Sequence, residues 1–329
     1  MKLIDLFSGI GGFSLGFQRA GYQFTEHYFS EIDKSAIANY KKNFPNAKYI
    51  GDITTIQPAN LAGADIITFG SPCQDFSLAG KRAGLAGAKS SLIEYAIALI
   101  ADIRPSIFIW ENVKGTFSSN ARADFWAIIQ AFANIGDYTI EWQLLNTSWV
   151  LPQNRERIYL IGHLAGRSIP GVFPIREDDC LPTTKTQSQS QAQISTTIKA
   201  NGNMNADDTY IIPKKAATLT AGGNSGGLHS DMTVIRQLPR GKNKGAELTI
   251  CPTISSNAFQ ENNLLGGIRR LTEIECERLQ GFPDNWTQYG NYNGRIRRIS
   301  KTKRYKLIGN AVTVDIVTMI AKRLKFTTQ

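Results

Sequence analysis

The first 164 residues alternate between short apolar runs and amphipathic segments, and this alternation restricts the fold most strongly. The apolar runs predict β-strands at 2–7, 24–30, 65–69, 107–110, 138–145 and 157–163. Segments with helical periodicity predict α-helices at 12–20, 34–43, 92–103 and 125–135. Strands that alternate with helices form a parallel or mixed sheet covered on both faces. The sequence therefore predicts an α/β protein with a doubly wound sheet.

The pattern changes near residue 165, where Gly, Asn, Thr, Ser and Gln become frequent and helical periodicity disappears. The low-complexity run 188–193 predicts a flexible loop. Three similar stretches (197–202, 218–223 and 253–257) precede β-like runs at 210–212, 233–235 and 263–265. A capping-box pattern at Thr272 and Glu275 then predicts a helix that Gly281 ends, and a last helix is expected over 311–324. We therefore expect three parts: a large domain (1–164), a smaller irregular β-rich domain (165–269) and a C-terminal segment (270–329) that returns to the first.

The chain carries 37 Lys and Arg against 27 Asp and Glu, a formal charge of +10. An excess of this size favours a polyanionic partner such as nucleic acid. Seven cations fall within 295–306, which contains no acid, and either a solvated basic loop or a phosphate contact explains them. The four cysteines show no zinc or disulfide spacing, so we expect a reducing cytoplasm. We expect no membrane segment and no signal peptide.

A glycine loop follows the first predicted strand, with Gly9, Gly11 and Gly12 where the backbone would pass close to a ligand. The dinucleotide fingerprint requires a third glycine at position 14, where this chain has Ser14. This departure argues against a pyrophosphate cofactor and leaves room for S-adenosylmethionine. Glu31, after the second strand, is placed to accept from both ribose hydroxyls, and Asp52 from the adenine amino group. A tight turn and two ordinary loop carboxylates are the alternative interpretation.

Cys73 follows the predicted strand 65–69, on a polar loop between Pro72 and Gln74. A deprotonated cysteine is the strongest nucleophile near neutral pH, although many lone cysteines only fill cores. Glu111 follows strand 107–110, so it is expected at the same sheet edge. Arg157 is the first residue of the predicted strand 157–163, and Arg155 lies two residues before it. The structural alternative for Glu111 is a helix-capping or salt-bridged acid. For Arg155 and Arg157 it is a surface ion-pair network with Glu156.

Eight segments together resemble the bacterial-type DNA (cytosine-5) methyltransferases, in the order found in that family. They are Phe7–Phe13, Glu31–Asp33, Gly51–Thr54, Pro72-Cys73-Gln74, Glu111-Asn112-Val113, Gln153–Arg157, Arg270–Pro283 and Gly309–Val312. The resemblance covers nearly the whole chain. It implies a methyltransferase-type (Rossmann-like) sheet for 1–164 and a target-recognition domain for 165–269. It also implies methylation of cytosine carbon 5 in double-stranded DNA, with S-adenosylmethionine as the donor.

The resemblance also assigns roles to residues. Cys73 would add to carbon 6 of cytosine, Glu111 would donate a proton at ring nitrogen 3, and Arg157 would hold the carbonyl oxygen with Arg155 bracing it. The cofactor site would be lined by Phe7, Gly9, Ile10, Gly12, Glu31, Ile32, Asp52, Ile53, Pro72, Asn310 and Val312. No metal is implied. Ile32 stands where some members of the family stack an aromatic ring on the adenine.

The target base lies inside a duplex, so the resemblance implies that it is flipped out and that a loop over 76–89 closes on the DNA. DNA contacts are expected from Ser77, Lys81, Lys89, Arg236 and Arg240. Asn201, Asn224 and Gln260 are further base-reading candidates that the sequence does not rank. We expect a monomer at the nucleoid of a prokaryotic cell or phage host, with any cognate restriction endonuclease acting separately. The target motif stays open.

Three other functions were weighed against this one. A tRNA-directed cytosine-5 methyltransferase is the nearest alternative, but that branch tends to lack an insert of about a hundred residues such as 165–267. A catalytically inactive DNA-binding module would not require the catalytic residues. A nicotinamide dehydrogenase would explain the alternating fold but not Pro72-Cys73-Gln74.

Overall fold

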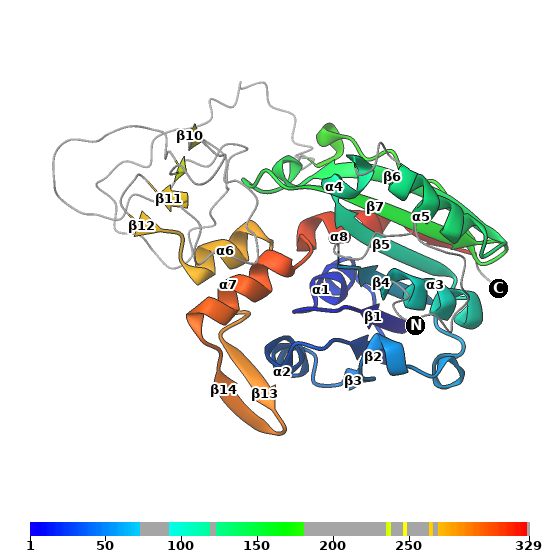
Figure 1. Cartoon of the computed structure of the whole chain (residues 1–329), viewed down its shortest axis with the longest axis horizontal. Helices are drawn as coiled ribbons and strands as arrows, with labels where there is room; N and C mark the ends of the chain where they lie inside the picture. The colour runs from blue at the N-terminus through cyan, green and yellow to red at the C-terminus, as the bar shows by residue number, and fades with distance from the viewer. Residues whose placement is uncertain are drawn as a thin grey trace, which may run out of the picture.

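The computed structural model describes residues 1–72, 92–118, 123–180, 235–237, 246–248, 263–265 and 269–327. Its centre is a seven-stranded sheet (Figure 1) with the order β3-β2-β1-β4-β5-β7-β6. The strands are β1 Lys2–Leu6, β2 Glu26–Ser30, β3 Lys48–Tyr49, β4 Ile66–Gly70, β5 Ile107–Val113, β6 Tyr138–Asn146 and β7 Glu156–Leu164. Strands β1 to β5 are parallel to one another, whereas β7 is antiparallel to both β5 and β6. The predicted mixed α/β sheet of methyltransferase type is confirmed.

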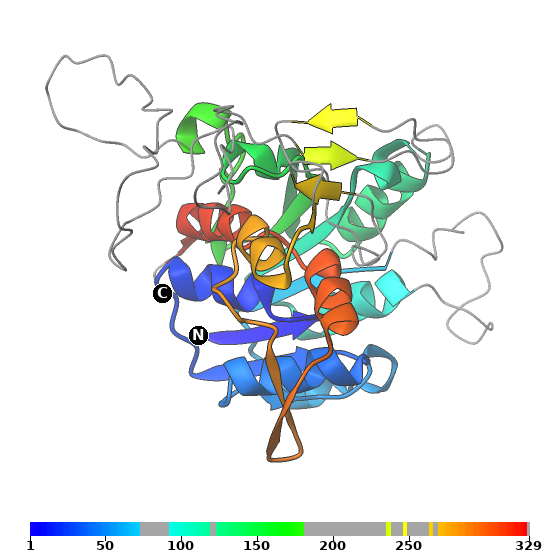
Figure 2. The same ribbon diagram turned by 90° about the vertical axis from the view of Figure 1, so that its left-hand side faces the viewer.

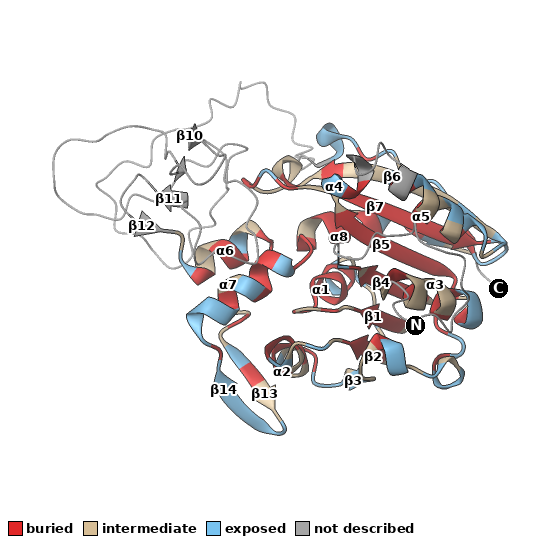
Figure 3. Ribbon diagram, viewed as in Figure 1, coloured by how far each residue is buried: buried red, intermediate tan, exposed pale blue. Residues whose placement is uncertain are grey.

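Helices cover both faces of this sheet, because successive residues of each buried strand point to opposite sides. Ile67 of β4 belongs to the core cluster beneath α3 and α5, whereas its neighbour Ile66 belongs to the cluster beneath α1 and α8. These helices are α1 Gly12–Arg19, α3 Leu92–Ile103, α5 Ala123–Ala133 and α8 Val314–Arg323. The short α4 Lys114–Ser118 follows β5, and α2 Lys34–Asn43 lies beside β2. Figure 3 shows the sheet as a buried layer between the helices.

Between residues 181 and 270, the described residues form four short strands. They are β9 Ile235–Gln237, β10 Ala246–Leu248, β11 Asn263–Leu265 and β12 Arg269–Arg270, in the order β10-β9-β11-β12, all antiparallel. The predicted strand 263–265 coincides with β11, and 233–235 overlaps the start of β9. The loop 188–193, the three similar stretches and the run 210–212 lie outside the described residues.

The C-terminal segment holds both predicted helices, together with a hairpin and a further helix that the sequence did not predict. The capping box is confirmed: Thr272 Oγ1 accepts from the Glu275 amide at 3.3 Å, and Glu275 Oε2 accepts from the Thr272 amide at 2.7 Å. It begins α6 Glu273–Leu279. A hairpin of β13 Tyr289–Tyr292 and β14 Arg295–Arg298 then leads into α7 Lys301–Asn310.

The last helix begins three residues later than expected. Residue Ala311 is extended, and α8 starts after Thr313 as its N-cap. A small pair of strands, β8 Ser168–Ile169 and β15 Lys325–Phe326, closes the end of the chain against the first domain. Within the described ranges no helix has the length and apolar character needed to cross a bilayer.

Candidate active site

The end of β4 meets the strand that carries Glu111. Gly70, the last residue of β4, lies opposite Glu111 in the parallel register. A Cβ atom at Gly70 would lie 3.1 Å from Glu111 Oε2, so the glycine leaves room for the carboxylate. Glu111 lies within β5 rather than after it, because pairing with β7 continues to Val113. Pro72 is exposed two residues beyond β4, and Cys73, which follows it, lies outside the described residues.

Two side chains of β5 hold the residue that precedes Pro72. Trp110 Nε1 donates to Ser71 Oγ at 2.9 Å, and Asn112 Nδ2 donates to the same oxygen at 3.1 Å. Asn112 Nδ2 also donates to the Ser71 carbonyl at 3.3 Å. All three residues are buried. Strand β5 therefore fixes both Glu111 and the base of the loop that carries the cysteine.

Arg157 faces Glu111 across the β5–β7 pair. Its Nε lies 3.0 Å from Glu111 Oε1, with both side chains largely buried. Oε1 accepts no hydrogen bond from any described residue, so the contact is an ion pair rather than an aligned hydrogen bond. Arg157 Nη1 donates to the Glu156 carbonyl at 2.8 Å. The Glu156 carboxylate itself pairs with Lys114 at 2.7 Å.

Arg155 lies in the core, not at the surface. Its Nη2 donates to the Ala311 carbonyl at 2.8 Å, and its Nη1 to the Gly309 carbonyl at 3.3 Å. Burial, with the nearby positive charge of Arg157, lowers the pKa of Arg155 to about 10, so the guanidinium stays protonated at neutral pH. Arg155 therefore holds the backbone on either side of Asn310.

Of the three glycines in the glycine loop, one has free space around its Cα atom and two are packed against other residues. Gly9 has φ +53, and a Cβ there would meet no described atom within 4 Å. A Cβ at Gly11 would lie 2.3 Å from the Phe44 ring, and one at Gly12 would lie 2.6 Å from Val312 Cγ2. Gly9 thus remains free for a ligand, whereas the other two glycines are required by packing of the protein against itself.

The oxygens of the two acids expected at the cofactor are partly occupied by hydrogen bonds within the protein. Glu31 Oε2 accepts from the Gly9 amide at 2.9 Å, and Oε1 accepts from the Ile32 and Asp33 amides at 2.7 and 2.9 Å. Asp52 caps the short 3₁₀ helix Ile53–Thr55. The side chain of Ile32 is 71% exposed beside Glu31, which suits an apolar contact with a flat ligand.

Some of the other predicted cofactor residues are buried, and others are exposed or half-buried. Ile10, Ile53 and Val312 are buried in the core, so only their backbone or side-chain edges can face a ligand. The Ile10 carbonyl already accepts from Trp286 Nε1 at 2.9 Å. Asn310 is exposed at the end of α7. Phe7 is half-buried and has φ +50, a conformation that turns the chain sharply after β1.

A buried polar network lies beneath the loop. Asp5 Oδ2 accepts from Ser14 Oγ at 2.9 Å and from the Tyr40 hydroxyl at 3.0 Å, and Oδ1 accepts from Thr68 at 3.0 Å. His27 Nε2 lies 3.0 Å from Ser14 Oγ. Burial raises the pKa of Asp5 to about 7 and lowers that of His27 to about 4. Ser14 is therefore a member of this network, which explains its place in the glycine loop.

Most of the predicted DNA contacts lie outside the described residues. Ser77, Lys81, Lys89 and Arg240, with the readout candidates Asn201, Asn224 and Gln260, lie outside the described residues. Arg236 belongs to β9, but its side chain is not described. No cluster of three or more metal-ligating side chains occurs in the described part of the chain.

Sequence reasoning missed the roles of Ser71 and Gln153. Ser71 could have been noted, because it stands between a predicted strand end and Pro72. Gln153 is fully buried and donates to the Leu279 carbonyl at 2.9 Å, a contact across 126 residues that no local pattern reveals. Gln153 thereby connects the segment before β7 to α6.

The chain was compared with known families and curated proteins. The profile of the C-5 cytosine-specific DNA methylases matches residues 1–326. Type II methyltransferase M.Bsp6I of Bacillus sp. (strain RFL6) is 29% identical over 98% of both chains. Type II methyltransferase M.NgoBI of Neisseria gonorrhoeae is 31% identical over 96% of this chain and 90% of its own length.

Solved structures share the fold. S. pombe Dnmt2 methyltransferase superposes with a TM-score of 0.62 at 18% identity, covering 97% of this chain and 96% of its own. A putative DNA modification methyltransferase of an E. coli prophage gives 0.57 at 22% identity and covers 98% of both chains. At these identities the likeness concerns the fold alone. The DNA-specific family profile makes the tRNA-directed alternative the weaker one. The chain belongs to the C-5 cytosine-specific DNA methylases and is a DNA (cytosine-5-)-methyltransferase.

Proposed function

We propose that the methyl donor is S-adenosylmethionine, bound where β1 and β2 end. The open backbone at Gly9 and the exposed Ile32 support this placement. A carboxylate has about four acceptor sites, and three at Glu31 are taken by amides. Glu31 Oε2 can therefore accept a hydrogen bond from one ribose hydroxyl without any change. To accept from the second hydroxyl, Glu31 would have to give up one of its hydrogen bonds to an amide. Ser8 Oγ, buried without a hydrogen-bond partner in the described residues, offers a further polar contact. Asp52 would receive the adenine amino group.

We propose that Cys73 attacks carbon 6 of cytosine as a thiolate. The new sulfur–carbon bond moves electrons toward ring nitrogen 3, where the Glu111 carboxyl donates its proton. Carbon 5 can then accept the electrophilic methyl group that the sulfonium of the donor supplies. Solvent then takes the carbon 5 proton, and the electrons of that bond form the carbon 5–carbon 6 double bond as the sulfur–carbon bond breaks. Ring nitrogen 3 returns its proton to Glu111, so the ring, the carboxyl group and the thiolate are all restored. The observation that carries this proposal is the Glu111–Arg157 pair at the end of β4.

Arg157 would hold the cytosine carbonyl oxygen while it keeps Glu111 in place. A guanidinium has five N–H donors. The Nε group faces Glu111 and one Nη1 group donates to the Glu156 carbonyl, so three N–H groups can still face a base. Arg155 would act as a positioning residue, because its donors are directed to backbone carbonyls beside Asn310.

We further propose that the enzyme modifies one short motif of duplex DNA and flips the target cytosine. Residues 165–269 would be the recognition domain, and 270–329 would join it to the catalytic domain of residues 1–164. Relatives named Type II methyltransferases favour a restriction–modification role, while one relative is the orphan methyltransferase M.SPRI of Bacillus phage SPR. The chain would work as a monomer beside a separate endonuclease.

The first test is cytosine-conversion sequencing of DNA from cells that express the chain, beside cells that express Cys73→Ser. We expect protected cytosines within one motif, and none with the variant. A well-expressed, folded wild-type chain that protects no cytosine would contradict methylation of DNA.

The covalent step has its own test. Once the motif is mapped, a duplex with 5-fluorocytosine at the target position is incubated with enzyme and donor. Fluorine cannot leave carbon 5 as a cation, so the adduct should persist and survive denaturation in detergent. Peptide mapping should place it on Cys73. An adduct that forms equally with Cys73→Ser would refute the assignment.

A further inference from the structure

The segment between α6 and α8 carries most of the unbalanced charge. Residues 285–314 contain no Asp or Glu. Two of its cations are paired, because Arg304 lies 2.9 Å from Glu277 and Lys306 lies 3.2 Å from Asp33. The other five form no ion pair with a described residue, and we call them the basic arm: Arg295, Arg297, Arg298, Lys301 and Lys303. Five charges are half of the formal excess of ten.

The basic arm is held in place by the rest of the protein. A two-stranded hairpin is marginal by itself, but β13 packs on α2. The buried Asn39 donates to the Trp286 and Tyr289 carbonyls at 2.8 and 2.9 Å. A Cβ at Gly290 would lie only 2.8 Å from the Ala38 Cβ, so the strand and helix are in close contact. All four residues of β14 are exposed.

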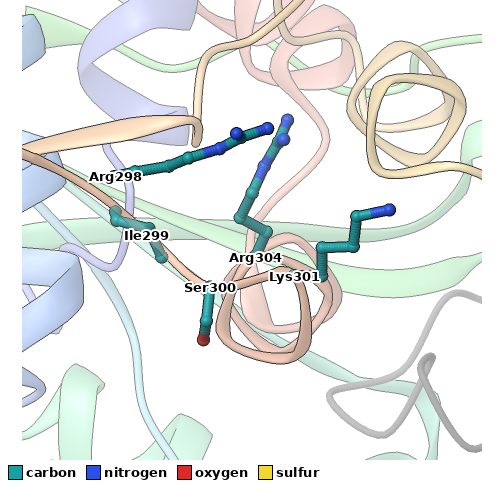
Figure 4. A pocket seen from close by; sticks show the side chains of 5 residues that line it. All are labelled: Arg298, Ile299, Ser300, Lys301 and Arg304. Carbon is teal, nitrogen blue, oxygen red and sulfur yellow. The ribbon is translucent and has the colours of Figure 1, made fainter.

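A concave surface of about 320 Å³ lies where the hairpin enters α7. It is lined by Arg298, Ile299, Ser300, Lys301 and Arg304 (Figure 4), and the heads of the three cations extend to one side of it. Since Glu277 neutralises Arg304, the free charge here belongs to Arg298 and Lys301. Two cations around a hollow suit an oxygen-rich anion, such as a phosphate group.

The basic arm lies to the side of the active site. Its hairpin packs on α2, which follows β2, and β2 is three strands from β5 in the sheet order. Strands β2 and β5 are therefore about 14 Å apart. This distance corresponds to about four base pairs along a duplex. Figure 2 shows strands β9–β11, α6, α7 and the hairpin following one another on one face of the molecule. A duplex on this face would therefore pass the target site before it reaches the basic arm.

We propose that the basic arm binds backbone phosphates of duplex DNA outside the target motif. The proposal rests on the proposed use of this face for target DNA. Phosphate contacts fix the register of a protein on the duplex without reading sequence. The basic arm would therefore add affinity for any flanking sequence and leave the choice of motif to residues 165–269.

The test compares Arg295→Gln/Arg297→Gln with Lys322→Gln/Lys325→Gln, which removes the same charge from exposed residues at the C-terminal end. Binding to a random-sequence 36-bp duplex is followed by fluorescence anisotropy at several salt concentrations. Each lost phosphate contact should reduce the salt slope by about 0.9. For the arm variant, the slope of log affinity against log salt concentration should be smaller by about 2, and affinity at 0.1 M salt should fall about 5- to 50-fold. The control should match the wild type, and Arg295→Lys/Arg297→Lys should retain most of the affinity. An arm variant with the wild-type slope overturns the proposal.

Position is tested with 36-bp duplexes that carry the mapped motif near one end, at the centre or near the other end. The arm variant should raise KM only where flanking DNA extends on one side, with kcat unchanged. An equal rise on a 12-bp duplex would place the arm at the motif and overturn the proposal. A greater loss of affinity for a structured RNA than for duplex DNA would also overturn it. The random-duplex measurement needs no methylation, so failure of the proposed chemistry would be seen separately.

Discussion

Replacement of Ser71 by alanine tests how the cysteine loop is anchored. Ser71 Oγ accepts from Trp110 Nε1 and Asn112 Nδ2, and all three groups are buried. In Ser71→Ala the Trp110 N–H has no acceptor, whereas Asn112 keeps the Ser71 carbonyl at 3.3 Å. A buried donor without a partner costs about 1–3 kcal/mol. We expect the free energy of unfolding to fall by that amount.

A double-mutant cycle isolates this hydrogen bond from simple loss of volume. Trp110→Phe removes the N–H group and leaves a smaller ring, so it destabilises the protein through a cavity as well. In the double variant no donor is left unpaired by the Ser71 change. Urea unfolding followed by circular dichroism should therefore show a double variant that is more stable than the sum of the single effects predicts, by about 1 kcal/mol. Strict additivity would refute the hydrogen bond.

The same substitution should affect catalysis, because Ser71 directly precedes Pro72 and Cys73. Small displacements of a reacting group lower rates steeply, and we expect kcat for methyl transfer to fall about tenfold. Ser168→Ala is the matched control, since Ser168 Oγ donates to the Ser106 carbonyl at 2.8 Å in a buried position at the opposite end of the β4–β5 pair from Ser71. The control should lose stability but keep kcat. Equal kcat in both variants would refute the anchoring role.

Three further changes have defined outcomes. Gly12→Ala would place a Cβ 2.6 Å from Val312 Cγ2, so the free energy of unfolding should fall by about 1–3 kcal/mol. Calorimetry should also show weaker binding of the methyl donor, and unchanged binding would contradict this. Arg155→Met leaves two backbone carbonyls beside Asn310 without their donor, so thermal unfolding should occur a few degrees lower and a wild-type midpoint would refute it. Burial raises the pKa of Asp5 from 3.8 to about 7, so its contribution to stability is complete below pH 4 and lost as the pH rises to about 7. In urea unfolding, the free energy of unfolding of the wild type should thus fall by about 4 kcal/mol relative to that of Asp5→Asn between pH 4 and pH 8. A difference between the two proteins that does not change with pH would exclude this titration.

Local pattern predicted the sheet and its helices well. The bounds of α2 and α3 agree with the expected 34–43 and 92–103, and Asp33 caps α2 as an N-cap acid should, accepting from the Ser35 and Ala36 amides. The glycine loop was predicted as one ligand-facing element, whereas only Gly9 is open. Gly12 meets Val312, 300 residues later, and sequence spacing gives no sign of such a contact.

The hairpin and α7 were missed for a different reason. Cations dominate 295–306, so the apolar period of a helix is not visible there. In the structure α7 buries Leu307 and Ile308, near its C-terminal end, while its first residues are exposed. Arg155 was also hard to assign, because an arginine is usually exposed. Its burial depends on carbonyl acceptors that lie more than 150 residues away.

Residues 309–313 connect the two halves of the proposed chemistry. Arg155, near Arg157 with its proposed contact to the base, donates to the Gly309 and Ala311 carbonyls, and Val312 packs on Gly12 beside the proposed donor site. The Thr313 hydroxyl lies 2.8 Å from that of Thr147, which directly follows β6. Methyl transfer requires carbon 5 of the base and the methyl carbon to be aligned at close range. Because one short segment contacts both sides, any change that shifts it should disturb donor binding and base positioning together, whereas changes at Ser71 should disturb only the latter.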